Sequence, residues 1–213
     1  MKRSVWSTAG LVLALLTVTA CSKGGNTDYR ADYAAARGFL QKGQYDSARV
    51  HFERAWKAAE RAGADTVMLD VSLGLAYTHI ALGDTSQGVE IIEKALDQAA
   101  KDFGDTSVLY AGVATQTAVN LARAGLLEEA DTLVGRAIHA WTDVPGKEAN
   151  LAGAWFTRGV ILEMQEDYAS ALNAYKKAQA IYQNAANATE QNRQLLEQKI
   201  QQMEEQLKAG SQG

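Results

Sequence analysis

Apolar and small residues recur with helical spacing along most of the chain. From Trp155 to Ala178, bulky and small side chains alternate on either side of a short polar turn at residues 165–167. Ala171 and Ala178 lie about two helical turns apart, so they share a face, and Tyr175 lies between them. Side chains that end at Cβ let a neighbouring helix approach, while aromatic rings fill the space around the crossing. This pattern predicts an antiparallel helix pair.

The same pattern occurs four times. Turn positions fall at Gly43, Gly83, Gly125 and Glu166, which gives periods of 40, 42 and 41 residues. A small residue stands seven positions before each turn and another stands five positions after it; these are Ala36, Ala76, Ala118 and Gly159, then Ala48, Gly88, Ala130 and Ala171. Internal repeats of this length indicate stacked supersecondary units. The sequence therefore predicts four helical hairpins in residues 28–186, at about 28–63, 65–104, 106–145 and 147–186.

Glycine and capping residues mark the boundaries of the hairpins. Gly63 and Gly104 each precede Asp or Thr, which are favourable N-caps for the next helix. The expected helices are 28–42, 45–62, 66–82, 85–103, 106–124, 127–142, 147–164 and 167–186.

The last segment follows a different pattern. Asn187 and Glu190 have the spacing of a capping box. An apolar stripe then runs along a helix rich in Gln and Glu, at Leu196, Ile200, Met203 and Leu207. Two heptads are too few for a stable coiled coil. We therefore expect residues 187–208 to form a helix that caps the last hairpin, with residues 209–213 as a disordered tail.

The repeated spacing resembles that of the tetratricopeptide repeat, with Trp155, Gly159, Leu162, Ala171, Tyr175 and Ala178 as its best-matching copy. The resemblance covers residues 28–185. A period near 41 is similar to the long repeats of kinesin light chains; HEAT and armadillo repeats have comparable periods, but the Gly-x4-Ala spacing across the turn favours the tetratricopeptide type. The resemblance implies an all-α, right-handed α-solenoid that acts as a non-enzymatic protein–protein interaction scaffold.

The resemblance also implies a concave groove, lined by the first helix of each repeat, that receives a protein or peptide segment. Carried over by repeat position, the lining consists of Arg30, Tyr33, Arg37, Leu40, Leu73, Tyr77, Ile80, Thr115, Val119, Arg123, Phe156, Val160 and Glu163. Aromatic and Arg side chains carry much of the energy at interfaces. Leu73, Ile80 and Val160 fit the core as well as the groove. The Lys and Asn residues of a family subtype that clamps a terminal carboxylate are not present at the corresponding positions.

The N-terminus has the pattern of an export signal. Lys2 and Arg3 precede an apolar stretch from Val5 to Ala20 that is short for a membrane span. Residues 18–21, Val-Thr-Ala-Cys, resemble a bacterial lipobox, so residues 1–20 are interpreted as a cleaved signal peptide. The sole cysteine, Cys21, is then the acylated first residue of a lipoprotein. It begins a flexible tether at 21–27. An ordinary signal peptide with an incidental cysteine, or an uncleaved anchor, is the alternative.

Composition narrows the possible functions. The formal net charge of −4 gives no basic footprint for nucleic acid. The three histidines, at positions 51, 79 and 139, lie in different predicted helices, and no metal-binding, phosphate-loop or nucleophile motif is present. We therefore expect no enzyme activity, cofactor, metal or small-molecule substrate.

The sequence accordingly predicts a lipid-anchored scaffold in the bacterial cell envelope. Ser22 after the cysteine favours the outer membrane, with the protein facing the periplasm. The expected partner is another protein, such as a component of secretin, pilus or outer-membrane protein assembly. The alternative is an accessory protein that binds peptidoglycan or assists a cell-wall enzyme.

Overall fold

The computed structural model describes residues 29–185 and 189–210. Within these ranges the chain forms nine helices, each packed against the next. They are α1 (Tyr29–Gln41), α2 (Tyr45–Ala62), α3 (Asp65–Ala81), α4 (Thr85–Phe103), α5 (Val108–Arg123), α6 (Leu127–Trp141), α7 (Glu148–Met164), α8 (Tyr168–Asn184) and α9 (Glu190–Gly210). The predicted all-α fold of stacked hairpins is confirmed.

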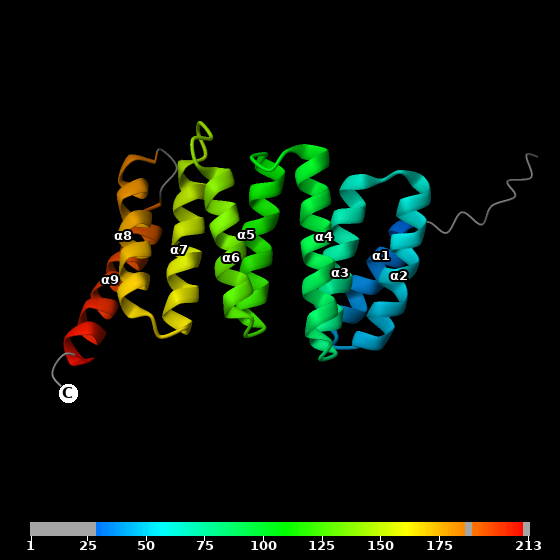
Figure 1. The fold of residues 1–213 in the computed structure, drawn as a ribbon, viewed down its shortest axis with the longest axis horizontal. Helices are drawn as coiled ribbons and strands as arrows, with labels where there is room; N and C mark the ends of the chain where they lie inside the picture. The colour runs from blue at the N-terminus through cyan, green and yellow to red at the C-terminus, as the bar shows by residue number, and fades with distance from the viewer. Residues whose placement is uncertain (1–28, 186–188, 211–213) are drawn as a thin grey trace, which may run out of the picture.

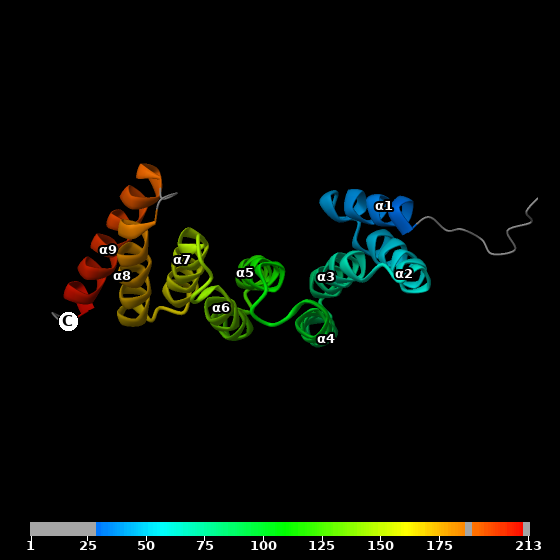
Figure 2. The same ribbon diagram turned by 90° about the horizontal axis from the view of Figure 1, so that it is seen from above.

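The helices stand side by side in a single row (Figure 1). Seen from above, the row is curved: α1, α3, α5 and α7 follow its inner side, and α2, α4 and α6 follow its outer side (Figure 2). The first helix of each hairpin therefore lies on the concave side, as the repeat pattern predicts. Helix α9 covers α8 at the far end of the row.

The four predicted turn positions share one backbone conformation. Gly43, Gly83 and Gly125 have φ values of 71°, 89° and 81°, and Glu166 has a φ of 63°. Glycine adopts this left-handed region without the steric cost that a Cβ carries, which explains three of the four residues. Because all four positions behave alike, the structure confirms the register of the repeats.

Small residues lie where the paired helices cross. Ala48, Ala130 and Ala171 are fully buried. A Cβ added to Gly159 would lie 2.5 Å from the Tyr175 ring, which is closer than packed atoms approach each other. At these crossings the small residue is therefore required by the packing of its partner helix.

The starts of α1 to α8 agree with the prediction to within one residue, except that of α5. Helix α5 begins at Val108 rather than at residue 106, because the Ser107 hydroxyl accepts a hydrogen bond from the Tyr110 amide at 3.1 Å and caps the helix. The N-cap of α3 is Ala64, whose side chain has no acceptor. The N-cap positions of α3 and α5 are therefore Ala64 and Ser107, each one residue away from the expected Asp or Thr.

The final helix is also shifted. Helix α9 starts at Glu190, where the Thr189 hydroxyl accepts a hydrogen bond from the Asn192 amide at 3.2 Å. It continues to Gly210, two residues beyond the expected end at 208. Asn187, the expected cap, lies outside the described residues, as do the predicted signal peptide, Cys21, the tether and residues 211–213.

Packing is uneven along the row. A continuous core joins repeats two, three and four and extends from Leu69 to Ile161. The α4 and α5 backbones nevertheless approach each other much less closely than those at the other repeat junctions. They are joined through Gly104, whose φ of 89° and ψ of 138° suit glycine. The junction between repeats two and three thus depends mainly on side chains.

No helix in the described part of the chain is both long enough and apolar enough to cross a membrane.

Candidate binding groove

A concave pocket of about 420 Å³ opens between the first helices of repeats one, two and three. Helix α1 contributes Tyr33, Arg37 and Leu40 to its lining. The remaining lining residues are Asp70, Leu73, Gly74 and Tyr77 of α3, Val113, Gln116, Thr117 and Asn120 of α5, and Phe52 of α2. We call this pocket the concave groove. Its size is within the range of ligand sites in proteins.

The end of the groove formed by α1 and α3 carries one positive and one negative side chain. The Arg37 guanidinium lies 5.8 Å from the centre of the Tyr33 ring, which is within the range of a cation–π contact. Burial raises the pKa of Asp70, and the charge of Arg37 opposes that rise. Burial, together with the charge of Asp70, raises the pKa of Tyr33. This end therefore offers both a cation and a partly desolvated carboxylate to a ligand.

The opposite end of the groove carries neutral hydrogen-bonding groups. Burial raises the pKa of Tyr77, while hydrogen bonding with Thr117 and Asn120 opposes the rise. The Thr117 hydroxyl oxygen is completely buried and its contacts do not meet the geometry of a full hydrogen bond. Gln116 donates to the Asn120 side-chain oxygen at 3.4 Å. Amide side chains one turn apart can bond both the N–H and the C=O of an extended chain.

Several of the predicted groove residues come together in this pocket. Tyr33, Arg37, Leu73 and Tyr77 all line the concave groove, and Leu40 lies beside them. They come from α1 and α3, so the first two repeats follow the expected arrangement.

Other predicted residues lie elsewhere. The Thr115 hydroxyl donates to the Ala111 carbonyl at 2.7 Å and accepts a hydrogen bond from the Trp141 indole at 3.2 Å, so it serves the contact with α6. Arg30 lies over the Tyr29 ring at 5.0 Å. Val119 is half-buried beyond the lining of the groove, and Arg123 is exposed at the end of α5.

In the fourth repeat, two predicted groove residues contact later helices of the chain. Phe156 packs against Tyr175 with 5.5 Å between ring centres, in the cluster that contains Leu196 of α9. Glu163 accepts hydrogen bonds from Tyr175 Oη at 2.7 Å and from Lys199 Nζ at 2.8 Å. The placement expected for these residues is therefore corrected: Phe156 contacts α8, and Glu163 joins α7 to α8 and α9, instead of lining the concave groove.

Sequence reasoning missed four polar residues of the groove: Asp70, Gln116, Thr117 and Asn120. Asp70 occupies the same repeat position as Arg30, so carrying that position into the second copy would have identified it. The three residues on α5 face back toward α3, at positions that the repeat pattern does not assign to a groove.

Two of the three histidines lie beside carboxylates. The His51 Nδ1 atom lies 2.7 Å from an Asp32 carboxylate oxygen, and its ring stacks on Phe39. His79 is in the last turn of α3, and its Nδ1 atom lies 3.4 Å from the carboxylate of Asp84, the N-cap of α4. Among the described residues, no group of three or more His, Cys, Asp or Glu side chains is arranged to hold a metal ion.

Comparison with known proteins agrees with this architecture. Tetratricopeptide repeat family models match residues 39–105 and 152–185. No curated protein matches the sequence significantly. Such repeats bind other proteins or peptides, and the families that contain them are typically non-catalytic scaffolds.

Solved structures show the same fold. A putative kinesin light chain from Podosopora anserina with nearly identical TPR-like repeats superimposes with a TM-score of 0.65 at 15% identity, covering 88% of this chain and 92% of that one. BtubC (BKLC) from P. vanneervenii gives a TM-score of 0.59 at 18% identity, over 86% and 81% of the two chains. Residues 39–105 and 152–185 of the chain are therefore similar to tetratricopeptide repeats, and the fold is that of solenoids built from kinesin-light-chain-like repeats.

Proposed function

We propose that this protein is a non-catalytic scaffold that holds an extended segment of a partner protein in the concave groove. The observation that carries the proposal is the pocket of about 420 Å³ in which three successive repeats combine Arg37, Asp70 and Tyr77 with two amide side chains. Leu40 and Leu73 supply apolar area, and the charged groups at one end and the neutral amides at the other distinguish the two directions in which a segment can lie.

We further propose that the scaffold is held at the bacterial outer membrane, facing the periplasm, by acyl chains on Cys21. The support is the lipobox-like sequence before the only cysteine and the short polar stretch that follows it. More than one acyl chain is needed for firm anchoring, which the lipoprotein modification supplies. An anchored scaffold in this position is suited to assisting assembly of an envelope complex.

The groove is tested with an Arg37→Ala, Tyr77→Ala double variant of the full-length protein. Loss of an Arg and a Tyr at the centre of an interface weakens binding by roughly tenfold or more. Proteins recovered from crosslinked native membranes are quantified by mass spectrometry. Arg123→Ala, which removes an exposed arginine outside the groove, is the control and retains the wild-type set of partners. Equal recovery by a folded double variant would refute the proposal.

The anchor is tested by Cys21→Ser in cells supplied with labelled palmitate. The wild-type protein incorporates the label and fractionates with membranes, whereas the variant incorporates none. Labelling of the serine variant would show that the acyl chains are attached elsewhere.

A further inference from the structure

A basic residue stands eleven positions after every turn position in the repeats. These residues are Arg54, Lys94, Arg136 and Lys177. In repeats three and four the cation lies over an aromatic ring from the first helix of its own repeat. Lys177 Nζ is 4.2 Å from the centre of the Trp155 ring, and the Arg136 guanidinium is 5.9 Å from that of Tyr110. Both contacts are within the range of a cation–π interaction.

Repeat two keeps the cation but lacks the ring. Ser72 occupies the repeat position of Trp155, and Met68 occupies that of Tyr110. At this place the structure has a cavity of about 580 Å³, lined by Ser72, Met68 and Lys94 among other residues. The smaller side chains therefore leave open a space that an aromatic ring helps to fill elsewhere in the same chain.

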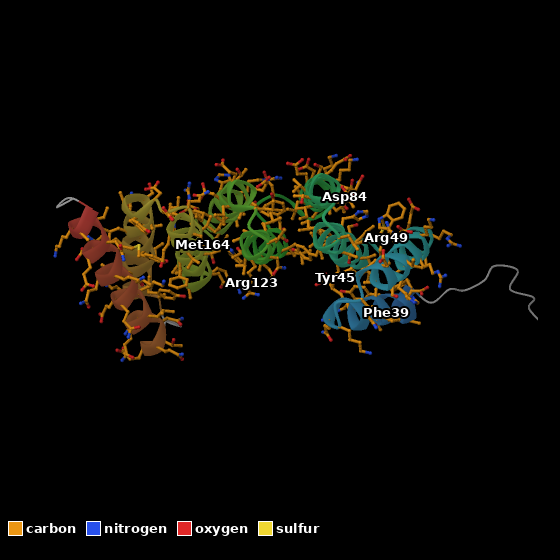
Figure 3. All side chains as sticks on the ribbon, turned by 90° about the horizontal axis from the view of Figure 1, so that it is seen from below. Phe39, Tyr45, Arg49, Asp84, Arg123 and Met164 are labelled. Carbon is orange, nitrogen blue, oxygen red and sulfur yellow. The ribbon has the colours of Figure 1, made fainter. Side chains whose placement is uncertain are left out.

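This cavity, which we call the outer pocket, is separate from the concave groove. It lies between α2, α3 and α4, whereas the groove is formed mainly by α1, α3 and α5. Helix α3 contributes Ser72 and Leu75 to the outer pocket but Leu73 and Tyr77 to the groove. The views from above and below show α4 on the side of the row away from α1 (Figures 2 and 3).

The lining of the outer pocket suits an indole ring. Trp56, Leu75 and Ile91 provide apolar and aromatic walls. The Lys94 side chain is 73% exposed, pairs with Glu90 on its own helix, and can swing over the face of a ring. Asp102 also lines the pocket and accepts a hydrogen bond from Gln98 at 2.7 Å, which leaves carboxylate capacity for an indole N–H. An aliphatic side chain would form neither a cation–π contact with Lys94 nor a hydrogen bond with Asp102.

We propose that the outer pocket binds an exposed tryptophan side chain of a partner protein. The partner's indole lies against α3 in the space that Trp155 fills in the fourth repeat, with Lys94 over its face and its N–H toward Asp102. The volume exceeds that of one indole ring, so residues flanking the tryptophan also enter. This site works independently of the concave groove and gives the scaffold a second contact on its outer side.

The test uses N-acetyl-5-fluorotryptophanamide as the probe and ¹⁹F NMR line broadening as the readout on the full-length protein. Ser72→Trp places the chain's own indole in the pocket, so it abolishes probe binding and raises the melting temperature. Lys94→Met weakens binding by about twofold to fivefold, as loss of an exposed cation–π contact does. Lys101→Met, on the same helix but outside the lining, leaves the affinity unchanged.

Two results would overturn the proposal. One is unchanged probe affinity in a Ser72→Trp variant whose circular dichroism matches the wild type. The other is displacement of the probe by N-acetyl-leucinamide as effectively as by N-acetyl-tryptophanamide. If Ser72→Trp does not fold, equal affinities of Lys94→Met and Lys101→Met refute the proposal instead. The groove variant Tyr77→Ala keeps full probe binding, so failure of this site is distinguishable from failure of the concave groove.

Discussion

Individual small residues show where local helix preference and packing disagree. Gly88 stands at a position that holds alanine in the other three repeats, Ala48, Ala130 and Ala171. The structure explains the exception, because a Cβ on Gly88 would lie 2.8 Å from the Ala76 carbonyl oxygen and 2.5 Å from Ile80 Cγ1. The backbone oxygen cannot move aside as the end of a flexible side chain can. Glycine at this position therefore allows α3 and α4 to approach more closely.

Replacing this glycine with alanine tests the explanation. Gly88→Ala lowers the free energy of unfolding by about 1–3 kcal/mol, since overpacking outweighs the gain in helix preference. Gly135→Ala in α6 is the matched control, because a Cβ there meets no atom within 4 Å. That change raises stability by about 0.5–1 kcal/mol. Urea denaturation measures both. If Gly88→Ala stabilised the protein as Gly135→Ala does, the close crossing of α3 and α4 would be contradicted.

At the scale of elements, one carboxylate joins the last three helices. Glu163 of α7 accepts hydrogen bonds from Tyr175 of α8 at 2.7 Å and from Lys199 of α9 at 2.8 Å. Burial raises the pKa of Tyr175 well above its usual value, and hydrogen bonding to Glu163 with its negative charge raises it further. The folded protein therefore holds the Tyr175 proton at a pH at which the unfolded chain releases it.

The Tyr175→Phe variant keeps the ring but removes this hydrogen bond. It lowers the free energy of unfolding at pH 7 by about 1–3 kcal/mol, as expected for a bond to a charged acceptor. The raised pKa means that the contribution of Tyr175 is complete below about pH 10 and declines as the pH rises further. Denaturation curves at pH 7 and above pH 10 therefore show that the free energy of unfolding falls less with rising pH in the variant than in the wild type. Tyr45→Phe, at the start of α2, is the control. If the free energy of unfolding fell as steeply with rising pH in Tyr175→Phe as in the wild type, the role assigned to Tyr175 would be contradicted.

The elements differ in how far the sequence determines them. The helical hairpins were predictable because small residues, turn glycines and helical spacing act locally and recur in four copies. The role of α9 as a cap followed from its apolar stripe, and Leu196 and Met203 are indeed fully buried, although Leu207 remains 37% exposed. The use of Glu163 by α9 was not predictable, because it depends on which face of α7 the final helix covers.

The outer pocket and the α5 side of the concave groove lay beyond sequence reasoning. The concave groove includes residues of α5 that face back toward α3, and their position depends on the loose junction of α4 and α5. The outer pocket depends on the absence of a ring opposite Lys94, which becomes meaningful only when the repeats are compared in space. Repeat patterns specify the shared scaffold, whereas sites arise where one copy departs from the others.

At the scale of the whole molecule, the solenoid presents two separate surfaces on opposite sides of α3. The concave groove combines charged and amide side chains, and the outer pocket combines apolar walls with a single lysine and a carboxylate. In the fourth repeat, Lys199 of α9 donates a hydrogen bond to Glu163, which stands at a predicted groove position. Both proposed contact surfaces thus lie in the first three repeats, which follow the proposed membrane anchor in the sequence.

The most direct test of the scaffold assignment is site-specific photocrosslinking in cells that produce the full-length protein. Benzoylphenylalanine replaces Gln116, which lines the groove, or Arg123, which is exposed on the same helix outside it. We expect a discrete crosslinked protein from position 116, its loss when Arg37→Ala and Tyr77→Ala are added, and no such product from position 123. No adduct at position 116, or the same adduct from both positions regardless of the groove substitutions, would contradict the assignment of the concave groove as the partner-binding site.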